Sequence, residues 1–126
     1  MRVFLLRLVF LFSVLFGNKA SAIEVYVQPL CFYTSSFQAY LETRLFIHEK
    51  GIQKTYLKDS TAFIQVLVTF YLRKDGELLK AEKLSLQSPA AKQVRPIIHA
   101  VRWAVSPGDY VLETKITDPS DPLSEI

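Results

Sequence analysis

Apolar and polar residues alternate along most of the chain after residue 22. In residues 23–27 every second residue is apolar, so these side chains lie on one face, as in a half-buried strand. We expect Pro29 to end this strand. Residues 39–48 alternate in the same way. One face carries Leu41, Thr43, Leu45 and Ile47, and the other carries Tyr40, Glu42, Arg44 and Phe46.

The strongest element is predicted at residues 62–72. β-branched, aromatic and leucine side chains fill most of it, with Gln65 and Thr69 as the polar exceptions. Such a run is typical of a strand in the middle of a sandwich sheet that is buried on much of both faces. An Asp-Gly pair at 75–76 then predicts a tight hairpin, with the returning strand over residues 78–86.

Shorter segments separated by turn residues make up the rest of the domain. They are a short strand at 52–57, a connector with room for one helical turn at 88–93, a strand at 97–105 and a strand at 110–117. His99 and Trp103 share the apolar face of their strand. A Ser-Pro-Gly-Asp turn precedes Tyr110, and in immunoglobulin-like domains a tyrosine at such a corner donates its hydroxyl to the preceding loop. About seven strands without a long amphipathic helix predict an all-β fold, an immunoglobulin-like antiparallel β-sandwich.

The first 22 residues have the three parts of a secretory signal peptide. Two early arginines accompany an apolar run that reaches Phe16, and small residues occupy the two positions that a signal peptidase recognises, Ala20 and Ala22. We therefore predict a signal-peptide helix and cleavage before Ile23. The alternative is an uncleaved membrane anchor, but a spanning helix needs about 20 apolar residues, and this run is shorter and contains a charge.

The predicted organisation is a signal peptide at 1–22, a β-sandwich domain at 23–117 and a linker or ragged tail at 118–126. We expect an exported protein that is periplasmic or associated with the outer envelope, without membrane attachment after cleavage. Cleavage removes three of the 15 basic residues and leaves 12 basic and 12 acidic ones. The mature domain is then close to neutral, which argues against binding to nucleic acid or anionic lipid.

Residues with catalytic or ligand-binding chemistry are sparse. Cys31 is the only cysteine, so no disulfide forms within the chain, and we expect a buried thiol rather than one paired with another chain. His48 and His99 are the only histidines and lack the paired spacing of metal ligands. Three tail residues offer oxygens to calcium but are too few for a site: Asp118, Ser120 and Asp121.

The chain contains no Gly-x-Ser-x-Gly elbow, no cysteine–histidine signature and no glycine loop that would hold phosphate. We therefore predict a non-enzymatic protein with no catalytic residue, no metal and no cofactor.

The segment 31–37 is predicted as the least strand-like and most aromatic part of the domain, with Phe32, Tyr33 and Phe37 as a possible contact surface. The first functional hypothesis is a structural or protein-interaction module that docks to a protein partner or a further domain through a sheet edge or an apolar patch. An unpaired strand at 110–117 would let the partner donate a strand. The alternative is a carbohydrate-binding module whose exposed aromatic rings stack on a glycan.

Several short motifs recur in the same order in a known family: Ile-Glu-Val-Tyr-Val at 23–27, Ala-Tyr-Leu-Glu-Thr at 39–43, the Asp-Gly hairpin, Lys-Leu-Ser-Leu-Gln-Ser-Pro at 83–89 and Ser-Pro-Gly-Asp-Tyr-Val-Leu-Glu at 106–113. In these motifs the chain resembles the N-terminal region of exported Bacteroidota proteins whose C-terminal part carries a GWxTD domain. The resemblance implies a β-sandwich and a cell-envelope address, and it lends no catalytic residues. The chain departs from the family because it has no Gly-Trp-x-Thr-Asp string and stops where the next domain would begin, as a short relative or a fragment would.

Overall fold

The computed structural model describes residues 22–126. The predicted signal helix and Ala20 lie outside the described residues. On the other side of the predicted cleavage site, Ala22 is exposed, whereas Ile23 is buried in the core. Within this described part of the chain, no helix is both long and apolar enough to cross a membrane.

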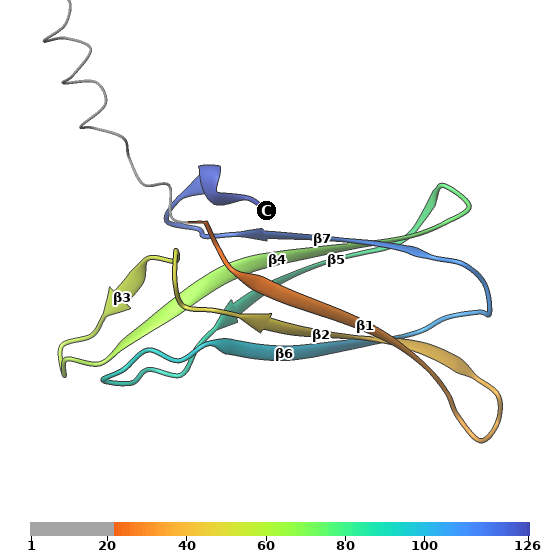
Figure 1. The fold of residues 1–126 in the computed structure, drawn as a ribbon, viewed down its shortest axis with the longest axis horizontal. Coiled ribbons are helices and arrows are strands. Elements are labelled where there is room, and N and C mark those ends of the chain that lie inside the picture. Colours follow the sequence, from red (N-terminus) through yellow and green to blue (C-terminus); the bar gives the residue numbers. More distant parts are fainter. Residues whose placement is uncertain (1–21) are drawn as a thin grey trace, which may run out of the picture.

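The predicted all-β fold is confirmed. Seven strands form two antiparallel sheets that face each other as a β-sandwich (Figure 1). The elements are β1 (Val25–Tyr33), β2 (Ala39–Ile47), β3 (Lys54–Tyr56), β4 (Ala62–Lys74), β5 (Glu77–Gln87), β6 (Ile97–Ala104), β7 (Val111–Thr117) and a short 3-10 helix, η1 (Pro122–Ser124).

One sheet has the strand order β1-β2-β6, and β4 is the central strand of the other. β5 pairs along one edge of β4, and β7 and the short β3 pair along the opposite edge. Trp103 of β6 contacts Phe70 of β4 and Glu82 of β5, so β6 faces β5 across the sandwich. β1 therefore lies on the same side as β7. These two sides are called the β5–β6 side and the β1–β7 side below.

The core forms on the inner face of β4. Every second side chain there is at most 3% exposed: Ile64, Val66, Val68, Phe70 and Leu72. The side chains between them, such as Gln65 and Thr69, are only half-buried on the outer face. The predicted burial of this strand on both faces is therefore wrong, because the second sheet covers only the inner face.

Two predicted turns are confirmed. Asp75 and Gly76 have φ angles of 52° and 80°, as a tight hairpin turn between β4 and β5 requires. Tyr110 donates its hydroxyl to the carbonyl of Ser106, which is the bond of a tyrosine corner. This bond fixes the loop between β6 and β7.

Several element boundaries differ from the prediction. Pro29 does not end the first strand, because β1 is an edge strand and an edge strand tolerates a residue without an N–H. The strand predicted at 52–57 is reduced to β3. No helical turn forms at 88–93, since Ser88 and Ala91 form hydrogen bonds to β4 instead.

Residues 118–126, which the sequence indicates as a linker or ragged tail, fold back against β7 (Figure 1). Asp118 is 2% exposed. Its carboxylate accepts hydrogen bonds from the backbone N–H groups of Gln53, at 2.7 Å, and of Ser120, at 2.8 Å. This aspartate thereby joins the end of β7 to the connection between β2 and β3.

Candidate functional site

The three predicted contact residues do not form one surface. Cys31, Phe32 and Tyr33 belong to β1 rather than to a loop, so successive side chains point to opposite faces of the sheet. Phe32 lies half-buried on the outer face, where its ring stacks on that of Tyr40 at 5.4 Å between centroids. Phe37, at the tip of the β1–β2 hairpin, is 87% exposed. Tyr33 points to the inner face. Of the three predicted contact residues, only Tyr33 belongs to the candidate site on that face.

The inner face of β1 is uncovered along much of its length. Every second residue of β1 lies opposite a buried residue of β2, as Val27 lies opposite Leu45 and Tyr33 opposite Ala39. Both members of each pair therefore point toward the core. Val27 is nevertheless 41% exposed and Tyr33 65% exposed. Side chains that face a sandwich core are normally buried, so part of the β1 face lacks a covering layer within residues 22–126.

Cys31 is exposed on this same inner face. The predicted burial of its thiol is therefore wrong. The alternation along the strand places Cys31 on the core side, but the opposite sheet does not extend over it in the described part of the chain.

The edge of β7 is also open. Among the described strands, β7 pairs with β4 alone. Ile116 turns its N–H and C=O away from β4 and exchanges two hydrogen bonds with Ile126, at 2.8 and 3.0 Å. Because backbone groups alternate along a strand, Leu112 and Thr114 also point their N–H and C=O away from β4. Those groups have no backbone partner within residues 22–126.

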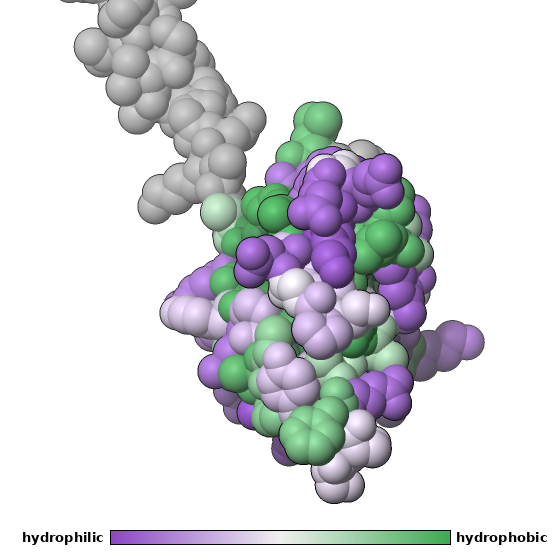
Figure 2. Space-filling view, turned by 90° about the vertical axis from the view of Figure 1, so that its right-hand side faces the viewer, coloured by the Kyte–Doolittle hydropathy of each residue, from purple (hydrophilic) through white to green (hydrophobic). Residues whose placement is uncertain are grey.

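A groove joins these two features and is called the β1–β7 groove. It has a volume of about 400 Å³, and its lining includes Pro29, Cys31, Tyr33, Leu41, Tyr110 and Leu112. Figure 2 looks onto the end of the molecule that carries the β1–β2 hairpin and the loop between β6 and β7, and hydrophobic residues lie there among hydrophilic ones. Apolar residues predominate in the lining of the groove, which combines exposed side chains of β1 with Leu112, whose N–H and C=O point away from β4.

The rim of the groove is braced by Lys74. Its ammonium group donates a hydrogen bond to the carbonyl of Pro107, at 3.3 Å, and lies 5.5 Å from the ring centre of Tyr110. A cation over an aromatic face is attracted by the ring electrons. With the tyrosine corner, this contact holds the loop in a defined position beside the opening.

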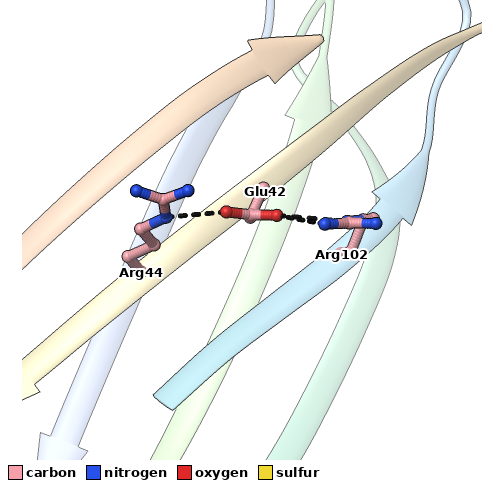
Figure 3. Close-up of polar contacts among 3 residues, drawn as sticks. All are labelled: Glu42, Arg44 and Arg102. Atoms are coloured by element: carbon pink, nitrogen blue, oxygen red, sulfur yellow. Dashed lines mark hydrogen bonds and ion pairs between the residues drawn. The ribbon is translucent and has the colours of Figure 1, made fainter. Parts of the chain in front are cut away.

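Apart from the groove, a cluster of charged side chains lies on the outer face of the β1-β2-β6 sheet (Figure 3). Glu42 is buried there between Arg44, which donates at 2.7 Å, and Arg102, which donates at 2.5 and 3.2 Å. The hydrogen bonds from Arg102 and then from Arg44 lower the pKa of Glu42. A carboxylate held ionised in this way is unsuited to act as a general acid. The cluster links β2 to β6.

The rings near this cluster are covered rather than open. The guanidinium group of Arg102 lies 4.9 Å from the ring centre of Tyr40, and Phe32 stacks on the same ring. A glycan needs a free ring face on which to stack. At Tyr40 these two contacts occupy the ring faces on which a glycan would stack.

The candidate ligand residues do not assemble into a metal site. Residues 22–126 contain no cluster of three histidine, cysteine or carboxylate side chains suited to hold an ion. His99 lies on the apolar face of β6, as predicted, but is only half-buried rather than a core residue, and His48 lies 3.3 Å from the carboxylate of Glu49. Both carboxylate oxygens of Asp118 are taken up by backbone N–H groups. Its role is structural, and the Asp-Pro-Ser sequence, which favours an aspartate-capped turn, is the signal that indicates it.

Comparison of the chain with protein-family models, with curated proteins and with solved structures gives no match. The resemblance to the GWxTD family thus stays a prediction.

Proposed function

We propose that this protein is a non-enzymatic interaction module of the cell envelope that docks a protein partner, or a further domain, in the β1–β7 groove. The observation that carries the proposal is the uncovered inner face of β1 beside the unpaired edge of β7. Exposed edges and contiguous apolar patches mark sites of protein–protein contact. A partner seated in the groove would cover Cys31 and Tyr33, which are now exposed, and would satisfy the edge of β7 at Leu112 at the same time.

The composition of the groove supports binding rather than catalysis. Its thiol, Cys31, has no histidine beside it in the lining, so the groove does not supply the usual base that activates a nucleophile. The exported location that the proposal assumes rests on the signal-peptide pattern before Ile23. The covered ring of Tyr40 favours a protein partner over a glycan.

Cys31 provides a direct test, because it is the only cysteine and lies in the groove. The full chain, expressed with export, would be labelled at Cys31 with a short photoreactive maleimide, mixed with envelope proteins and irradiated. The matched control carries Cys31→Ser with Ile98→Cys, since Ile98 is 77% exposed on the outer face of β6. We expect a polypeptide adduct from Cys31 and several-fold less from position 98. Equal yields, or an adduct that only a glycosidase removes, would contradict the proposal.

A further inference from the structure

We propose that the partner segment binds as an extended strand that adds to β7 in antiparallel orientation, in the register that the Ile126–Ile116 pair begins. This inference rests on the proposed function and specifies its partner. The occupant is a segment of another polypeptide with apolar residues at alternate positions and a basic residue between them.

The backbone of the chain itself shows that this edge accepts a strand. Ile126 donates its N–H to the carbonyl of Ile116 and accepts the N–H of Ile116 in return. Two bonds exchanged between the same two residues define a hydrogen-bonded antiparallel pair. The next pairs of the same kind along the edge fall at Thr114 and Leu112. Main-chain bonds at an open edge are the usual source of affinity when a partner adds a strand.

The groove determines which kind of side chain is favoured at the inward-facing positions of the added strand. Residues directly opposite each other in an antiparallel pair point to the same face of the sheet. Leu112 and Thr114 point inward, since they share the alternation of buried Ile116. The segment residue opposite Leu112, which lines the groove, would enter it and cover Cys31 and neighbouring side chains of β1, and the residue opposite Thr114 would lie on the same inward face. Apolar residues are therefore expected at these two positions.

The outer face of β7 determines which residue is favoured in the added strand between these two apolar positions. Glu113 is exposed and makes no ion pair with any described residue, whereas Lys115 already pairs with Glu125 at 3.2 Å. An opposite charge directly across an antiparallel pair is stabilising. A lysine or arginine opposite Glu113 completes the pattern apolar, basic, apolar.

A second copy of this chain cannot form the symmetric pair centred on Thr114. In a symmetric pair of two β7 strands centred on Thr114, Leu112 of one copy would fall opposite Ile116 of the other. That position is already occupied by Ile126. A partner strand that begins its pairing at Thr114 has no such conflict.

The test adds a strand to the full chain in two registers of the same composition. One variant carries Thr-Val-Lys-Val-Thr after Ile126, which places valines opposite Thr114 and Leu112 and lysine opposite Glu113. The control carries Val-Lys-Val-Thr-Thr. A slip of one residue moves every side chain to the other face. We expect only the first variant to melt at a higher temperature and to slow amide exchange at Leu112 and Thr114 by about tenfold or more. Equal melting and exchange in the two variants would overturn the strand-addition proposal.

The same variants separate this inference from the proposed function. The first extension should abolish the photo-adduct at Cys31, and the shifted extension should leave it. An adduct that both extensions leave intact would mean that a partner binds the groove without adding a strand. If exchange slows in the first extension variant but the unextended chain gives no photo-adduct, the strand site is supported and the proposed partner is contradicted. If sedimentation shows that the unextended chain is a dimer with Leu112 and Thr114 protected, the occupant is a second copy and the proposed partner is wrong.

Discussion

The two sides of the sandwich are built differently. On the β5–β6 side, Trp103 is 4% exposed, packs edge-on against Phe70 at 5.2 Å and donates its indole N–H to Glu82 at 2.7 Å. On the β1–β7 side, Val27 and Tyr33 point to the inner face and remain 41% and 65% exposed. One large side chain with a polar partner can close the gap between two sheet edges. No described side chain closes the opposite gap in this way, and the inner face of β1 stays exposed there.

On the β5–β6 side, which Trp103 closes, a charged side chain also lies over the indole ring. The ammonium group of Lys80 lies 5.6 Å from the ring centre of Trp103 and 4.0 Å from the carboxylate of Glu82. Long cationic side chains often lie over apolar surface in this way while their charge stays in water. On the open side, Cys31 and Tyr33 stay exposed on the inner face of β1.

The largest expected effect is the loss of the closing side chain. Trp103→Ala should lower the free energy of unfolding by about 3–5 kcal/mol, because it removes a buried aromatic group and leaves a cavity. Tyr33→Ala, on the open side, should change it by less than about 0.5 kcal/mol. Urea unfolding of both variants measures the difference. Similar losses would show that the two sides do not differ in the way described.

The next effect concerns the segment that brings Ile126 to the open edge. Asp118→Ala should cost about 1–3 kcal/mol, because it leaves the N–H groups of Gln53 and Ser120 without their carboxylate partner. Asp121→Ala is the control, since its side chain caps only the exposed N–H of Leu123. Hydrogen exchange at Ile116 should speed up in the first variant only. Unchanged exchange at Ile116 would mean that Asp118 does not hold the segment in place.

Much of the fold could be predicted because local patterns determine it. The shared face of Leu41, Thr43, Leu45 and Ile47 in β2, the Asp-Gly hairpin and the corner at Tyr110 each depend on neighbouring residues and are confirmed. Alternation assigns a side chain to a face but does not reveal whether that face is covered. The uncovered inner face of β1 and the exposure of Cys31 follow from the reach of the other sheet, and no local pattern contains that information.

Other features depend on contacts between distant residues. Pro29 reads as a strand end in sequence, and only the edge position of β1 makes it compatible with a longer strand. Glu42 is buried on an outward face because Arg102, 60 positions away in the chain, bonds to it across the sheet. The β1–β7 groove depends both on local patterns and on contacts between distant residues. The aromatic segment predicts Tyr33 at a contact surface, but no local pattern predicts that Tyr110 and Leu112 line the same groove.

A smaller and opposite effect is expected inside the core that both sides share. The hydroxyl of Thr43 is fully buried and has no hydrogen-bond partner among the described residues. Thr43→Val keeps the shape and removes this unpaired group, so stability should rise by about 1 kcal/mol. Thr69→Val, at a half-buried position on the outer face of β4, should leave the urea midpoint almost unchanged. A loss of stability in Thr43→Val would show that the hydroxyl has a partner after all.

The smallest effect is expected from the cluster that links β2 to β6 on the outer face. The pKa of Glu42 is lowered in the folded protein from its ordinary value of 4.5, chiefly by the hydrogen bonds from Arg102. A lowered folded pKa contributes stability that is fully present above the ordinary value and is lost as the pH falls through the folded value. Glu42→Gln should therefore be less stable than the parent at neutral pH, and the two should converge in acid below pH 4.5.

The effect is small because both guanidinium groups are more than half exposed and water screens the pair. Glu113→Gln is the matched control, since this exposed carboxylate makes no ion pair with a described residue, and its urea midpoint at neutral pH should stay close to that of the parent. Urea midpoints across the acid range measure the convergence. A constant gap between the parent and Glu42→Gln at all pH values would mean that shape, and not charge, holds β2 to β6 on the closed side. In that case the contrast between the two sides would rest on Trp103 and its packing alone.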